Sequence, residues 1–305
     1  MRDAPATSDL VTHTDNKRGA AWMFCSAVFF SLIAMGIKKA GENLPTAEIV
    51  FFRCLFGMTV VAPFIARQGL SVYRTQRPGL HVSRLICAAI GMNSGFYAVT
   101  HLELATAVSL SYTRPLFMIL LAVIFLGEVV RWRRGLATIV GFGGVLIMLG
   151  PSHVPFSWAV AAGLLSALAV AGAMAVVKQQ AATDGPATIM AWFATGTVFL
   201  TAIPAMFVWQ TPSGEQWFWL VSIGITASLG QYMMIKAFSI GDATVMNPID
   251  YVQIIFVTAL GYWVFDEIPS IWTGVGAAVI VVSTLYILFR ESVVKQAPAT
   301  PLIKE

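Results

Sequence analysis

One stretch of the sequence, residues 105–128 (ATAVSLSYTRPLFMILLAVIFLGE), constrains the fold more than any other. It has the length and apolar content of a membrane-spanning helix, which needs about 20 residues. Yet Tyr112, Thr113, Arg114 and Pro115 stand near its middle. A charge at that depth costs about 2.5 to 3.5 kcal/mol, and a proline removes a backbone hydrogen bond and kinks the helix. The stretch therefore predicts a membrane helix interrupted by a polar site.

The composition places the whole chain in the membrane. Of its 305 residues, 57% are hydrophobic and only 11% are charged, whereas soluble domains average about 25% charged residues. The basic residues sit in short loops between apolar runs rather than on one face, which argues against nucleic-acid binding. Cys25, Cys54 and Cys87 fall inside apolar runs without metal or disulfide spacing, so we expect neither a metal site nor a cofactor.

Ten apolar runs predict an all-α integral membrane protein with ten transmembrane helices. The polar segments 1–18 and 291–305 are expected to be disordered tails. The runs lie at 19–37, 46–66, 81–100, 104–127, 135–150, 157–178, 186–209, 217–237, 243–265 and 270–290.

Lysine and arginine positions predict the orientation of these helices. Fifteen of the 19 fall on the side that holds both termini, and only Lys38 and Lys39 fall on the other side. Cytoplasmic loops carry the excess of positive charge. We therefore expect a multi-pass protein of a bacterial-type inner membrane with both termini in the cytoplasm.

The two halves of the chain, 19–150 and 157–290, read as repeats of five helices. Each has a run that closes on a glutamate, Glu128 or Glu267, followed by a helix rich in small residues. We interpret these two glutamates as structural. Aligning them pairs Arg114 with Gln253. Because five is odd, the second repeat must be inverted, as in many secondary transporters whose site lies between the repeats.

A series of short motifs runs through both halves of the chain. They are EIVFFR at 48–53, Pro115 with 127–128, Gly135 with GFGG at 141–144, KAFSIGDA at 236–243, NPIDY at 247–251, GYWVFDEIP at 261–269 and the small residues at 274–278. In the order and spacing of these motifs the chain resembles the EamA-type members of the drug/metabolite transporter superfamily. The resemblance implies secondary transport of a small metabolite without ATP, and it leaves substrate and direction open.

Arg114 and Asp250 are the charged candidates for the central site. A guanidinium binds carboxylate or phosphate groups through paired hydrogen bonds, so Arg114 is expected to hold such a group on the substrate. Asp250 is a candidate partner for a substrate amine, for Arg114 or for a coupling proton. The alternative for Arg114 is neutralisation by another side chain that only fixes helix packing.

Uncharged side chains supply the rest of the predicted site. Aromatic walls with a few placed polar groups are typical of small-molecule sites. The candidates are Tyr97, Tyr112, Trp192, Asn247, Tyr251 and Gln253.

Three further ionisable residues are candidates for coupling or gating. Glu48 and Arg53 lie in the second run, where structural pairing is the competing interpretation, and His101 lies at the turn before the fourth run. A histidine titrates near neutral pH and suits gating. Pro115 and Pro248 are the candidate hinges.

These features predict a secondary active transporter that moves a carboxylate-bearing or zwitterionic metabolite by alternating access, with proton coupling as a hypothesis. Import of a compound like S-adenosylmethionine or riboflavin and export of an amino acid or metallophore stay open. Expected partners are a small substrate, protons and the bilayer, and a homo-oligomer is compatible but not required. The alternatives are a polyspecific exporter and a non-transporting receptor or assembly subunit. No nucleotide or catalytic motif points to an enzyme.

Overall fold

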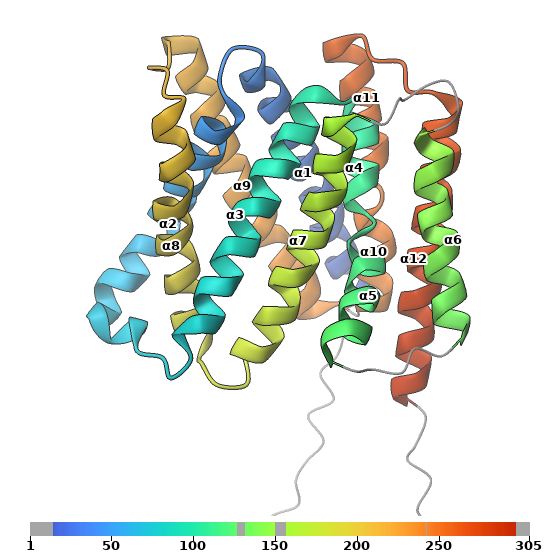
Figure 1. Cartoon of the computed structure of the whole chain (residues 1–305), viewed down its shortest axis with the longest axis horizontal. Coiled ribbons are helices and arrows are strands. Elements are labelled where there is room, and N and C mark those ends of the chain that lie inside the picture. Colours follow the sequence, from blue (N-terminus) through green and yellow to red (C-terminus); the bar gives the residue numbers. More distant parts are fainter. Residues whose placement is uncertain (1–14, 127–131, 150–156, 242, 297–305) are drawn as a thin grey trace, which may run out of the picture.

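The structure of the chain, a computed structural model, describes residues 15–126, 132–149, 157–241 and 243–296. The described residues form a bundle of helices (Figure 1). The elements are α1 (Asn16–Gly41), α2 (Thr46–Gln68), a short 3₁₀ helix η1 (Gly69–Tyr73), α3 (Pro78–His101), α4 (Leu104–Ser111), α5 (Arg114–Leu126), α6 (Trp132–Leu149), α7 (Trp158–Gln180), α8 (Pro186–Phe207), α9 (Gly214–Ile240), α10 (Ala243–Asp250), α11 (Gln253–Phe265) and α12 (Ile271–Gln296).

The helices confirm an all-α membrane protein. Among the described residues, seven helices are long and apolar enough to cross a membrane, or eight if one bent pair is a single span. Two shorter apolar helices, 135–148 and 271–287, lie in α6 and α12. The first helix begins at Asn16, capped by the Asp15 side chain, inside the segment that the sequence assigned to a tail. Segments 1–14 and 297–305 of the predicted tails lie outside the described residues.

The main helix contacts join the two halves of the chain. Helix α1 packs most extensively on α9, α3 on α7, α6 on α12 and α2 on α8. In each pair, one helix comes from the first predicted repeat and the other from the second. The start of α1 and the end of α12 lie at the lower end of the bundle in Figure 1, here called the terminal end, and the opposite end is called the distal end.

Small residues allow α6 and α12 to approach closely. A Cβ atom on Gly276 would lie 2.5 Å from the Gly144 carbonyl oxygen, and one on Gly144 would lie 2.9 Å from the Gly276 oxygen. Membrane helices use such small residues to bring their backbones together. This contact fixes the last helix of each half against the other.

Two of the predicted apolar runs are each divided into two helices, one run in each half of the chain. The 104–127 run divides into α4 and α5 at Tyr112 and Thr113. There the backbone forms tighter bonds, from Tyr112 N to Ser109 O and from Thr113 N to Leu110 O, both 3.1 Å long. Pro115 is the second residue of α5, where its missing N–H leaves no helical bond unmade.

The 243–265 run breaks in the same way into α10 and α11, at Tyr251 and Val252. Val252 N bonds to Ile249 O at 3.0 Å, again one residue closer than in an α-helix. The break occurs although Ile254, not a proline, aligns with Pro115 of the first repeat. Pro248 instead lies inside α10, before the break.

Candidate functional site

The two helix breaks meet each other. The ring of Tyr112, at the end of α4, packs edge-on against Tyr251, in the break after α10, with ring centroids 4.6 Å apart. In the alignment on Glu128 and Glu267 these two tyrosines occupy equivalent positions in the two repeats. Arg114 begins α5 and Asp250 ends α10, so each break carries one charge.

Arg114 is held by the carbonyl that the break releases. Pro115 has no N–H to bond to the Ser111 carbonyl, and Arg114 Nε donates to that oxygen instead, at 2.7 Å. Arg114 Nη2 also donates to Ser111 Oγ at 3.1 Å. The sequence Ser-Tyr-Thr-Arg-Pro therefore both breaks the helix and fixes the guanidinium beside the break.

Arg114 and Asp250 interact electrostatically, yet they form no ion pair within 4.0 Å. Both side chains are partly exposed. Opposite charges that face one site without closing on each other leave both available to a ligand. The Tyr112 hydroxyl is buried and has no hydrogen-bond partner.

Two residues that the sequence did not single out support the breaks. Thr284 of α12 donates to the Tyr112 carbonyl at 3.5 Å. Ser31 of α1 donates to the Gln253 carbonyl at 3.4 Å. A hydroxyl inside an apolar run was the available signal in the sequence, but its partners lie 172 and 222 residues away in the chain.

Other residues predicted for the central site lie in two places, near the second break and on α3. Gln253 begins α11 beside the second break, and the Asn247 backbone lies in α10. Tyr97 of α3 packs against the core cluster that contains Tyr112, and its ring also stacks on the exposed His101 at 3.9 Å between centroids. This places His101 at the distal end, one turn beyond Tyr97.

Trp192 lies in a different network, at the terminal end. Its Nε1 donates to the Tyr73 carbonyl at 3.0 Å, and its ring stacks on His81 with centroids 5.1 Å apart. His81 is buried and contacts Asp184 at 3.2 Å and Gln180 at 3.1 Å. The structure thus groups Trp192 with α3, α7 and α8 rather than with the helix breaks.

Glu48 and Arg53 of α2 are separate from each other. The Glu48 side chain is buried at the distal end, where one oxygen accepts from Gln210 N at 3.2 Å and the other has no partner. Arg53 Nη1 contacts Met92 Sδ at 3.3 Å, and the described residues show no ion pair for it. The structural pairing expected for these two side chains is therefore not with each other.

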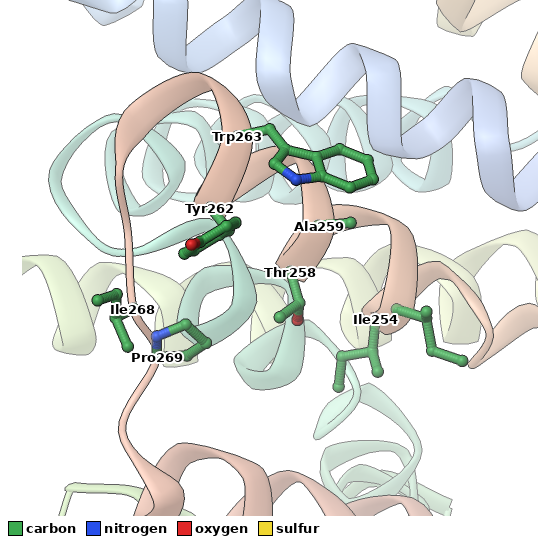
Figure 2. Close-up of a pocket in the computed structure, with 8 residues that line it drawn as sticks. Ile254, Thr258, Ala259, Tyr262, Trp263, Ile268 and Pro269 are labelled. Carbon is green, nitrogen blue, oxygen red and sulfur yellow. The ribbon is translucent and has the colours of Figure 1, made fainter.

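A groove on the outside of α11 is apolar and distinct from the charged centre. It has a volume of about 610 Å³, and Figure 2 shows Tyr262, Trp263, Ile268 and Pro269 around it. Trp263 and Ile268 are 76% and 77% exposed, as expected for side chains that face lipid. Within the described part of the chain, no group of three or more His, Cys, Asp or Glu side chains could hold a metal ion.

Fold and site together define a multi-pass membrane transporter. A polar centre at two broken helices, one from each half of the chain, is an arrangement that secondary transporters use for substrate binding. The EamA-like transporter family model matches the chain twice, at residues 17–150 and 157–289, so the chain belongs to the EamA-like transporter family. It is a small-molecule transporter and not an enzyme.

Relatives with established names support this assignment. The chain is 32% identical to an S-adenosylmethionine uptake transporter of Rickettsia prowazekii over 273 residues, covering 90% of this chain and 93% of the relative. It is 33% identical to a riboflavin transporter of Brucella anthropi (88% and 96% covered) and 32% identical to a pseudopaline exporter of Pseudomonas aeruginosa (88% and 95% covered). A solved crystal structure shares the fold, with a TM-score of 0.61 and 19% identity over 91% of this chain and 99% of that one.

Proposed function

We propose that this chain is a secondary active transporter that moves a zwitterionic or carboxylate-bearing metabolite across a bacterial inner membrane by alternating access. The observation that carries the proposal is the contact between the two helix breaks, where the Tyr112 ring packs against the Tyr251 ring, with Arg114 at the first break and Asp250 at the second. Each break belongs to a different half of the chain. Movement of one half against the other would therefore expose the same site to either side of the membrane.

The charges of the site favour a substrate with two opposite charges. Arg114 suits a carboxylate, because its guanidinium offers paired donors, and Asp250 suits an ammonium or another cation. The buried Tyr112 hydroxyl lacks a partner, and leaving such a group unpaired costs about 1–3 kcal/mol. A polar substrate atom would remove that cost. Tyr251, Gln253, Asn247 and Tyr97 complete the proposed wall.

We assign the proposed hinges to two prolines and the proposed proton coupling to one acid. Pro115 and Pro248 flank the two breaks and would act as hinges. Asp250 would take up and release the coupling proton as access alternates, with Glu48, Arg53 and His101 as secondary candidates for coupling or gating. The excess of lysine and arginine at the terminal end supports a cytoplasmic position for that end. The site is formed within one chain, so a homo-oligomer is compatible but not required.

The first test is a thermal-shift screen of the purified protein in detergent against carboxylates, amino acids, nucleosides, flavins and metallophores. A ligand that binds only the folded protein raises its melting temperature. We expect a stabilising compound whose effect is lost in Arg114→Ala and kept in Arg67→Ala, a control that removes an exposed charge at the end of α2. A hit that survives Arg114→Ala would move the site elsewhere.

The second test measures transport itself. The stabilising compound is followed in proteoliposomes in both directions, because the relatives include an uptake transporter and an exporter. Accumulation that requires an imposed pH gradient and is lost in Asp250→Asn would support proton coupling. Equal accumulation without the gradient would contradict coupling while leaving the substrate assignment intact. No movement in either direction would contradict transport of that compound.

A further inference from the structure

A buried ion pair joins the two halves of the chain at the distal end. Lys38, near the end of α1, pairs with Glu267, in the turn between α11 and α12. Their side chains are only 16% and 13% exposed. Lys38 also donates to the Leu102 carbonyl, and its ammonium lies 5.4 Å from the centre of the Phe265 ring. The pair is therefore largely removed from water, and its ammonium has a second acceptor besides the carboxylate.

The turn after α11 is shaped to present Glu267. Asp266 adopts a left-handed conformation, with φ of 54°, which aspartate tolerates better than most residues. The N–H groups of Asp266 and Glu267 then both donate to the Gly261 carbonyl. A Cβ atom on Gly261 would lie 2.9 Å from Glu267 Oε2, so the glycine makes room for the carboxylate.

Glu267 reaches from the second half of the chain to the start of α4 in the first half. Its Oε2 accepts from the Leu104 N–H at 2.8 Å. Leu104 is the first residue of α4, where a helix has unpaired N–H groups and a partial positive charge. The carboxylate thus binds both a lysine and a helix N-terminus.

Helix α4 connects this ion pair to the central site. It has eight residues, about 12 Å of helix, and residues 104–110 are all buried. Its far end is capped by Tyr112, the residue that meets Tyr251 at the helix breaks. A rigid buried segment with Glu267 at one end and the site at the other transmits movement of one end to the other.

We propose that Lys38 and Glu267 form a latch that closes the distal mouth of the central site and must separate for that mouth to open. The proposal rests on the alternating access proposed above. The latch ties α1 and α4 of the first half to α11 of the second, and alternating access requires those halves to move apart at this end. In the proposed orientation the mouth faces away from the cytoplasm.

The charges around the latch favour a pair that can open as well as close. Glu103 lies one residue before Leu104, and burial together with the nearby Glu267 carboxylate raises its pKa, against the smaller opposing effects of Thr106 and Lys38. Lys38 thus faces two carboxylates. The next residue, Lys39, forms an exposed ion pair with Glu42 at 2.7 Å, and both residues belong to the same end of α1.

Chemical labelling tests the latch without requiring transport. In a chain with Cys25, Cys54 and Cys87 replaced by alanine, a reporter is introduced by Ser111→Cys at the first break. A membrane-impermeant maleimide is then applied to right-side-out and to inside-out vesicles. Loss of one partner of a buried charge pair should raise labelling in right-side-out vesicles by about tenfold in Glu267→Gln. Lys38→Met should do the same.

Glu42→Gln is the matched control, because it removes a carboxylate at the same end of α1 whose ion pair, with Lys39, is local and exposed. Labelling should not change in it. Unchanged labelling in both latch variants, an equal rise in Glu42→Gln, or a rise confined to inside-out vesicles would each overturn the proposal. Since the readout needs no substrate, failure of the transport assays would leave this result interpretable.

Discussion

Tyr112 and Tyr251 pack edge to face at an interplanar angle of 76°, and each lies at the break of its own helix. They come from the two halves of the chain, so the contact marks the interface between the halves at the level of the polar site. Aromatic pairs in this geometry contribute about 0.5–1.5 kcal/mol beyond their buried area. The site is therefore a packed junction as well as a binding surface.

Arg114 variants separate binding from packing. Arg114→Ala should weaken substrate binding by about 1.5–3 kcal/mol, the range for hydrogen bonds to charged groups, or about tenfold to 150-fold in Kd. Arg114→Lys should recover only part of this loss, because an ammonium cannot donate in the paired geometry of a guanidinium. Titration calorimetry with the compound found by thermal shift measures both. Full recovery by lysine would show that charge alone suffices.

Tyr112→Phe should move stability and binding in opposite directions. The substitution removes a buried hydroxyl that has no partner, so the ligand-free protein should melt at the same or a higher temperature. If the substrate supplies the missing partner, its Kd should rise about fivefold, the value for a neutral hydrogen bond. Tyr262→Phe, on the exposed face of α11, is the control. A lower melting temperature in Tyr112→Phe would indicate a partner within the protein.

The sequence indicated which two spans hold the site, but it did not indicate which residues from other helices bond to the breaks. Polar residues inside the apolar runs 104–127 and 243–265 marked both interrupted helices. The second run also breaks, at Tyr251 and Val252, although Ile254 and not a proline aligns with Pro115. The Ser31 hydroxyl, which is remote in the chain, bonds to the Gln253 carbonyl beside that break. Local patterns carry no information about such contacts.

The contacts of Glu267 are likewise made with residues remote in the chain, which the sequence pattern did not reveal. The sequence places Glu267 at the end of a helical run, where a carboxylate opposes the helix dipole, and predicts only a structural role for it. In the structure it faces the N-terminus of a different helix, α4, and pairs with Lys38, 229 residues away. Its repeat counterpart, Glu128, lies outside the described residues.

We expect Asp184, in the turn between α7 and α8, to make a pH-dependent contribution to the free energy of unfolding. Burial acts to raise the pKa of Asp184, but hydrogen bonds from Thr75, His81 and Thr183 outweigh it and lower the pKa below its usual value. A carboxylate with a depressed folded-state pKa stabilises the protein above its unfolded pKa of about 3.9, and this contribution is lost as the pH falls through the folded value.

Asp184→Asn should therefore reduce the stability at pH 7 by about 1–3 kcal/mol, since His81 is buried and loses a charged partner. The difference in melting temperature from the parent should shrink as the pH falls below about 4. Melting curves in detergent between pH 7 and pH 3 measure this. Glu42→Gln, which loses only an exposed pair, should change little at any pH. A constant difference across the range would contradict the assignment.

Alanine substitutions at two glycines of α12 should change the melting temperature in opposite directions. Gly276→Ala places a Cβ atom 2.5 Å from the Gly144 oxygen and 2.7 Å from Met148, both in α6. Because the nearest atoms are backbone, the helices must separate, and overpacking of this kind costs about 1–3 kcal/mol. Gly274 has nothing within 4 Å of its Cβ position, so Gly274→Ala should stabilise α12 by up to about 1 kcal/mol through helix propensity. Melting temperatures of the two variants in detergent should therefore fall on opposite sides of the parent. Equal shifts would show that α6 and α12 do not touch at Gly144.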